Sequence, residues 1–137
     1  AEAAGAEALI VANAILGLAI DAETMRPKLG NVIGGLTGPA VKPVILRMVR
    51  QCAEAVRIPI IGCGGISTGE DAVEYMLAGA SAVQMGTISF VHPGAMGEAI
   101  GWIADYCRRH GIAEVSDLTG ALRPPLAAET GLGIAAQ

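Results

Sequence analysis

Residues 58–87 read IPIIGCGGISTGEDAVEYMLAGASAVQMGT, and this stretch decides the fold. It opens at 58–65 on an apolar run that ends in glycines, which is typical of a strand buried on both faces. Residues 67–70 have the spacing of a capping box at a helix start, and Gly79 is placed to end that helix. A second apolar run, at 82–87, ends in Gly and Thr. The stretch therefore predicts a strand, a helix and a second, parallel strand.

The same alternation continues toward the N-terminus. Residues 8–13, ALIVAN, form another short apolar run and predict a third buried strand. Residues 14–39 are rich in Gly, Pro, Asn and Asp and are expected to form a long loop, a kind of segment that is usually functional or disordered. A helix is expected to begin between Pro39 and Pro43. One of its faces collects the apolar residues Val41, Val44, Ile45, Met48, Val49, Cys52, Ala53 and Val56.

The alternation also continues toward the C-terminus. Past His92-Pro93-Gly94, an amphipathic helix is expected to end at His110-Gly111, with its apolar face formed by Met96, Ile100, Ile103 and Cys107. A short helical piece is expected over 115–122. Residues 123–137 contain two prolines and no period, and they are interpreted as a flexible tail.

Composition excludes several functional classes. The chain has 137 residues and a net charge of -4, which gives no basic patch for nucleic acid. No apolar run approaches the ~18 residues of a membrane-spanning helix, and no secretory signal is visible. Three widely spaced cysteines, Cys52, Cys63 and Cys107, argue against a disulfide framework and favour a reducing cytoplasm. No His/Cys/Asp cluster has metal spacing.

The number of βα units suggests that the chain is part of a larger fold. Three strands and three main helices make three units, whereas a closed (β/α)8 barrel needs eight units and ~250 residues. Three apolar parallel strands would also leave two exposed edges. We therefore expect residues 1–122 to be a partial barrel followed by the tail at 123–137. A small open α/β domain, complete in itself, is the alternative.

Two glycine-containing corners are the strongest chemical signal. Gly64 and Gly65 follow one predicted strand, and Gly86 and Thr87 follow the next. Active sites of barrels form at the carboxyl ends of strands, and the loops after the last two strands often hold a phosphate. Glycines let a phosphate approach main-chain N–H groups, and Thr87 adds a hydroxyl donor. The alternative is that these glycines only turn the chain.

Two further positions are candidates on weaker grounds. Asn13 ends the first strand, where its carboxamide can both donate and accept hydrogen bonds at the barrel mouth. From the residues alone, an Asx turn or a strand-end cap is the favoured explanation of Asn13. The stretch GGLTGP, which contains Thr37 and Gly38, lies just before the long helix. It is either a backbone cradle, a hinge or a turn.

Four stretches together resemble class 1 dihydroorotate dehydrogenases: ANAILGLAIDAET, LGNVIGGLTGPAVKPVILRMV, IPIIGCGGISTGEDAVEYMLAGASAVQMGT and DLTGAL. They are most similar to the NAD-linked subtype, whose catalytic chain pairs with an FAD-containing iron–sulfur subunit. The resemblance covers residues 1 to about 124 and implies the C-terminal portion of a (β/α)8 barrel that carries FMN, about strands six to eight. It also implies a cytoplasmic homodimer that oxidises dihydroorotate to orotate in pyrimidine biosynthesis.

The resemblance assigns roles to particular residues. FMN would be bound by Thr37, Gly38, Cys63, Gly64, Gly65, Gly86 and Thr87, with Cys63 lying against the flavin as a neighbour. Asn13 would hydrogen-bond the pyrimidine ring of the substrate. Ala14 departs from the family, which usually has Thr or Ser there. The catalytic cysteine base and the flavin-contacting lysine of the family have no counterpart here, so this chain alone is expected to be inactive.

Two other functions are kept as alternatives. The first is a different barrel enzyme that binds phosphate through the same two corners. The second is a half barrel without catalytic activity that associates with itself or with a complementary half.

Overall fold

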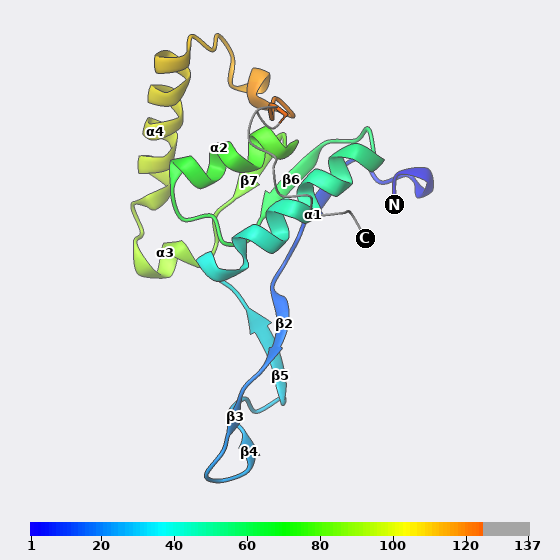
Figure 1. The fold of residues 1–137 in the computed structure, drawn as a ribbon, viewed down its shortest axis with the longest axis vertical. Helices are drawn as coiled ribbons and strands as arrows, with labels where there is room; N and C mark the ends of the chain where they lie inside the picture. Colours follow the sequence, from blue (N-terminus) through cyan, green and yellow to red (C-terminus); the bar gives the residue numbers. More distant parts are fainter. Residues whose placement is uncertain (125–137) are drawn as a thin grey trace, which may run out of the picture.

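A computed structural model describes residues 1–124 (Figure 1). Its centre is a three-stranded sheet in the order β1-β6-β7, formed by β1 (Leu9–Val11), β6 (Ile60–Cys63) and β7 (Ala82–Gln84). Both strand pairs are parallel, so that Ile61 is aligned with Ile10 on one side and Ala82 on the other. The predicted parallel sheet is confirmed, although each strand is shorter than the apolar run that predicted it.

Helices cover one face of this sheet. α1 (Lys42–Ala55) and α2 (Gly69–Ala78) pack against each other and against β6 (Figure 1). α4 (Ala95–His110) packs against α2, and the short α3 (Ile88–Val91), which the sequence did not predict, connects β7 to α4. Short 3-10 turns complete the described chain: η1 (Glu2–Ala4), η2 (Pro39–Val41) and η3 (Val115–Leu118). η3 is shorter than the helical piece expected over 115–122.

The predicted apolar face of α1 is only partly buried. Val41, Ile45 and Val49, spaced four residues apart, are almost fully buried. Val44, which belongs to the same apolar set in the sequence, is 44% exposed. A spacing of four residues follows one narrow ridge of a helix. The ridge at 41, 45 and 49 therefore faces the sheet, whereas Val44 lies on its flank.

α2 begins and ends at side chains that cap it. Thr68 accepts a hydrogen bond from the Asp71 N–H (3.1 Å), and the Asp71 carboxylate accepts one from the Thr68 N–H (3.0 Å). The capping box is therefore Thr68–Asp71, one residue later than the spacing at 67–70 indicated, because Asp serves here in place of the expected Glu. Gly79 ends the helix as predicted.

α4 ends at Gly111 as predicted, but its buried face differs from the expected one. Ala95 and Ala99 are each 4% exposed, whereas Met96 and Ile100 are 47% and 70% exposed. Small residues let two helices approach closely, and a Cβ on Gly69 of α2 would lie 2.6 Å from the Trp102 Cβ. The close approach selects the alanine side of α4, which leaves Met96 and Ile100 facing outward. Ile103 and Cys107, also part of the expected face, are half-buried against the core clusters.

The segment 14–39 is not an unstructured loop, and that prediction is wrong. β2 (Ile15–Leu18) pairs antiparallel with β5 (Ile33–Leu36), and β3 (Ile20–Asp21) pairs with β4 (Arg26–Pro27). This two-stranded arm extends away from the helices (Figure 1). Its glycines and polar turn residues resembled loop composition, while the alternating Ile and Leu residues carried the strand signal. The predicted tail falls almost wholly on 125–137, outside the described residues.

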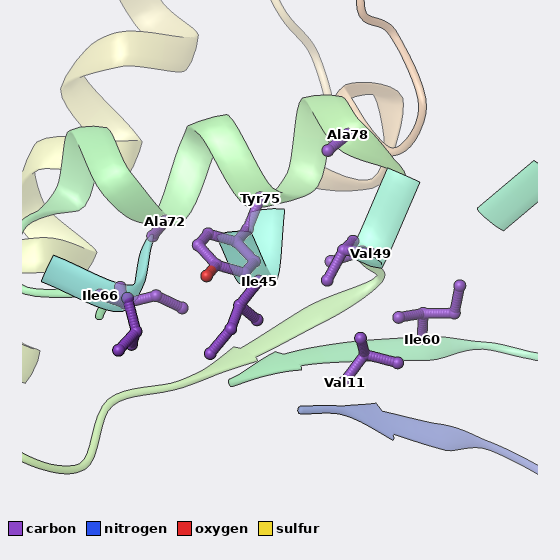
Figure 2. Packing of buried hydrophobic residues seen from close by; sticks show 10 residues of the cluster. Val11, Ile45, Val49, Ile60, Ile66, Ala72, Tyr75 and Ala78 are labelled. Atoms are coloured by element: carbon purple, nitrogen blue, oxygen red, sulfur yellow. The ribbon is translucent and has the colours of Figure 1, made fainter. Parts of the chain in front are cut away.

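The core is organised around Tyr75 of α2. Figure 2 shows its ring between α2 and the strands, near Ile45 of α1. Tyr75 and Ile45 are both fully buried. The ring reaches β6 because Gly62 has no side chain, and a Cβ at that position would lie 2.4 Å from the Tyr75 Cδ1. Packing between α2 and the sheet therefore depends on a glycine in the central strand.

An ion cluster joins the first two helices. The Lys42 Nζ contacts Asp71 Oδ1 at 2.6 Å and Glu74 at 3.0 Å. The other carboxylate oxygen of Asp71 accepts the Ser67 N–H at 2.8 Å. Burial pushes the pKa of Asp71 upward, but the hydrogen bonds from Lys42 and from the Ser67 and Thr68 N–H groups outweigh it and lower that pKa. The pKa of Lys42 is raised, chiefly by its hydrogen bond to Asp71.

The contact between Gly62 and Tyr75 leads to a first prediction. Gly62→Ala should lower the free energy of unfolding by about 2–3 kcal/mol, because the added methyl group overpacks the core. Gly97→Ala is the matched control. Gly97 is exposed within α4 with no atom near its Cβ position, so alanine should stabilise the helix by about 0.5–1 kcal/mol. Urea unfolding followed by circular dichroism measures both, and equal effects would contradict the packing account.

The ion cluster leads to a second prediction, on pH dependence. Because folding lowers the pKa of Asp71, its contribution is present above its usual pKa of 3.8 and is lost as pH falls through the folded value. Asp71→Asn should therefore cost about 1 kcal/mol at pH 7, and the difference from wild type should shrink below pH 4. Asp105→Asn, which removes an exposed partner of Arg108, is the control and should change stability little. A difference independent of pH would refute this account.

Candidate functional site

A pocket lies beyond the carboxyl ends of the three parallel strands. Because β1, β6 and β7 are parallel, their carboxyl ends open onto the same edge of the sheet. The pocket has a volume of about 140 Å³. It is lined by Asn13, Ala14, Thr37, Gly38, Val41, Cys63, Gly64, Gly65, Ile66, Ser67, Gln84, Gly86, Thr87 and Ile88. This lining includes all eight residues that were predicted from the sequence to bind cofactor or substrate.

The turn after β6 requires glycine at two successive positions. Gly64 and Gly65 have φ of 142° and 71°, a region that L side chains rarely adopt. A Cβ on Gly64 would lie 2.2 Å from the Ile45 Cδ1, and one on Gly65 would lie 2.7 Å from the Lys42 main-chain nitrogen. The turn thus packs directly on the beginning of α1, and other residues are excluded by conformation and by space.

Tyr75 holds this turn from beneath. Its hydroxyl donates a hydrogen bond to the Gly64 carbonyl at 2.6 Å, whereas the Lys42 carbonyl is at 3.5 Å. Burial, reinforced by nearby Cys63, raises the pKa of Tyr75 to about 12. The phenol is therefore a neutral donor throughout the neutral pH range.

The corner after β7 has a glycine for a different reason. Gly86 is exposed, and a Cβ there would meet no protein atom within 4 Å. Neither packing nor a positive φ requires glycine at this position. Because Gly86 lines the pocket, the effect of its missing side chain is to leave space in the pocket beside Thr87. The Thr87 side chain forms no capping bond to α3, which leaves its hydroxyl available at the pocket.

The two corners also offer main-chain donors. Within residues 1–124, the N–H groups of Gly64, Gly65, Gly86 and Thr87 take part in none of the main-chain hydrogen bonds found outside helices and strands. N–H groups that face a common space can form a concavity that suits an anion. The residues present thus fit a phosphate group: two corners offer donors, and one of them lacks a side chain where a Cβ would narrow the space.

The remaining wall comes from both ends of the arm. Gly38 is buried with φ of 90° and precedes η2, and Thr37 lies beside it. Asn13 follows β1, and its Oδ1 accepts the Ala14 N–H at 2.8 Å. The carboxamide therefore makes the local strand-end contact, and Asn13 also lines the pocket. Its predicted hydrogen bonds to a ligand stay a prediction.

Two polar residues of the pocket were not identified from the sequence. Ser67 belongs to the turn after Gly65, and its N–H is bound by Asp71. Gln84 is an exposed residue in the otherwise apolar strand β7. Gln84 could have been predicted from the sequence, because it is a single polar residue within an apolar strand. Ser67 carried no such signal, because its place in the pocket follows from the three-dimensional turn.

Several polar and aromatic residues lie apart from the pocket. His92 is exposed and contacts the Glu98 carboxylate at 2.7 Å, and the Trp102 and Tyr106 rings stack with centroids 5.4 Å apart. Cys52 and Cys107, which lie outside the pocket, and Cys63, which lines it, are free thiols. Among residues 1–124, no cluster of His, Cys, Asp or Glu has the arrangement of a metal site. In that same range, no helix combines the length and apolarity that crossing a membrane would require.

Comparison with known proteins places this chain in a family. A family model described as dihydroorotate dehydrogenase matches residues 1–101. The chain is 56% identical over 121 residues to the catalytic subunit of dihydroorotate dehydrogenase B (NAD(+)) from Parabacteroides distasonis, covering 88% of this chain and 40% of that protein. The protein of the same name from Geobacter sulfurreducens is 56% identical over 119 residues, covering 87% and 39%.

Solved structures give the same relationship. The dihydroorotate dehydrogenase of Eimeria tenella in complex with ferulenol superposes with a TM-score of 0.73 at 28% identity, covering 88% of this chain and 32% of that one. Its ligand-free form gives 0.71 at 30% identity, covering 90% and 34%. The chain thus has the α/β fold of part of a (β/α)8 barrel and spans about 40% of the curated relatives it matches. It belongs to the dihydroorotate dehydrogenase family.

Proposed function

We propose that this chain supplies the FMN phosphate site of a class 1 dihydroorotate dehydrogenase. The observation that carries the proposal is the convergence of the Gly64-Gly65 and Gly86-Thr87 corners on one pocket at the carboxyl end of the sheet. Backbone amides from both corners and the Thr87 hydroxyl would bind the phosphate oxygens. Membership of the family supports FMN as the cofactor.

The binding mode rests mainly on N–H dipoles rather than on a cation. Lys42 lies next to Gly65, but its ammonium group is paired with Asp71 and Glu74. An N–H cradle of this type binds phosphate in other folds, where glycine-rich loops present successive amides. Thr37 and Gly38 would form the side wall, and Cys63 would lie against the flavin.

The site residues also suggest how the substrate is held. FMN, when bound, would supply a hydride acceptor for the oxidation of dihydroorotate to orotate. Asn13 lies on the same pocket and would hydrogen-bond the pyrimidine through its carboxamide. Ala14 offers no hydroxyl at the neighbouring position. The family's catalytic cysteine and lysine are not among the residues of this chain. We therefore propose that the chain alone binds FMN but does not oxidise dihydroorotate.

The wider assembly follows from the NAD-linked relatives. Their name, catalytic subunit of dihydroorotate dehydrogenase B (NAD(+)), implies a second kind of subunit. We propose that this second subunit carries FAD and an iron–sulfur cluster and passes electrons to NAD. We also propose that the catalytic chain forms a homodimer and that the enzyme is cytoplasmic.

Flavin binding tests the phosphate site. Gly86→Ala should preserve folding, because the added methyl group meets no protein atom, yet it should weaken FMN binding about tenfold, or ~1.4 kcal/mol, by narrowing the cradle. Gly101→Ala is the control, since its Cβ also meets nothing and Gly101 lies outside the pocket. Flavin fluorescence titration measures both. A folded wild-type chain that leaves FMN fluorescence unchanged would sink the proposal.

Orotate binding tests the role of Asn13. With FMN bound, Asn13→Ala should weaken orotate binding about fivefold to tenfold through the loss of one or two hydrogen bonds, while FMN affinity stays the same. Asn31→Ala, in the exposed turn of the arm, is the control. The orotate-induced change in the flavin absorption spectrum reports binding. Equal orotate affinities in the two variants would remove Asn13 from the substrate site.

A further inference from the structure

Tyr75 has a role that its burial alone does not explain. Its ring is fully buried against β6, yet its hydroxyl reaches the Gly64 carbonyl at 2.6 Å in the turn that lines the pocket. We propose that Tyr75 is a positioning residue, whose hydroxyl fixes the orientation of the Gly64–Gly65 peptide so that the Gly65 N–H faces the phosphate. This inference rests on the proposed function of the pocket.

The geometry of a peptide unit links the two groups. The Gly64 carbonyl and the Gly65 N–H belong to the same planar trans unit, in which C=O and N–H point in opposite directions. Tyr75 holds the carbonyl on the side of the buried core, where Figure 2 shows the phenol beneath α2. The N–H of that unit is therefore turned away from the core and toward the pocket that Gly64 and Gly65 line.

A restraint is needed because this peptide lies between two glycines. Rotation of a peptide unit changes ψ of the preceding residue and φ of the following one, and glycine tolerates both signs of φ. At almost any other pair of residues, side chains would restrict that rotation. Within residues 1–124, the Tyr75 hydroxyl is the one donor found for the Gly64 carbonyl. Loss of this hydrogen bond thus leaves the unit free to turn its N–H away.

The residues around Tyr75 bring its hydroxyl to the Gly64 carbonyl, in addition to packing its ring. Gly62 leaves room for the ring, since a Cβ there would lie 2.4 Å from it. A phenylalanine would fill the same space without a donor. The Lys42 carbonyl at 3.5 Å is too distant to be the main partner. Gly62, Tyr75 and Gly64 thus form one unit that connects α2 to the pocket through a hydrogen bond.

The experiment compares FMN with riboflavin, which lacks the phosphate. In the full chain, Tyr75→Phe should reduce the preference for FMN over riboflavin about threefold to tenfold, since one phosphate donor is no longer held in place. Riboflavin affinity should stay unchanged. Val73→Ala is the control. It lowers stability from a buried position on α2 that faces the other cluster, with Met76 and Leu118, and should leave the preference intact.

A ligand-free measurement separates positioning from stability. In ¹⁵N–¹H spectra, the Gly65 amide signal should shift or broaden in Tyr75→Phe, while Gly111 at the end of α4 should not change. An unchanged FMN preference and an unchanged Gly65 signal would overturn the role of Tyr75 and leave the phosphate site standing. A wild-type chain with no preference for FMN over riboflavin would instead overturn the proposed function, and this inference with it.

Discussion

The site depends on how closely the central strand and its turn can approach two helices. Tyr75 lies against β6 only because Gly62 has no side chain, and the turn at Gly64 and Gly65 lies against α1 only because neither residue has one. At both contacts, main-chain atoms of the strand or turn lie where side chains normally pack. The polar groups of that main chain must then find partners or face solvent. The Gly64 carbonyl accepts a hydrogen bond from Tyr75. Within residues 1–124, the Gly64 and Gly65 N–H groups take part in none of the main-chain hydrogen bonds found outside helices and strands.

No lysine or arginine is among the described residues that line the pocket beside the Gly64–Gly65 turn. Lys42 borders the turn, but two carboxylates hold its charge on the helix side. The same Asp71 also binds the Ser67 and Thr68 N–H groups and so ends the turn at a defined point. One carboxylate thereby joins α1, the turn and α2. Asp71 and Tyr75 restrain the turn from its two ends, and both side chains come from α2.

Local patterns predicted the parts of this arrangement that depend on local physics. The parallel strands, the corners after β6 and β7 and the cap at Gly79 were visible as apolar runs and as glycines that end elements. The predicted burial of the strands on both faces was wrong, because Ile10 is 57% exposed and Ala82 and Gln84 are also exposed. The arm at 15–36 was missed because two-stranded pairing is non-local, and its glycines resembled a loop. The bond from Tyr75 to Gly64 was missed for a related reason. Tyr75 was visible only as one more residue of a helix, and its partner lies eleven positions away.

The proposed phosphate cradle is a nearly local structure, and this explains how a chain matching about 40% of its relatives' length carries a coherent set of candidate site residues. Both corners follow strands that are adjacent in the sheet, and Cys63 is aligned with Gln84. That register places the two corners side by side without help from distant segments. In the proposed enzyme, oxidation of the substrate would require more, because the base would come from a strand end outside this chain. The proposed phosphate binding and the proposed ring chemistry would therefore depend on different lengths of chain.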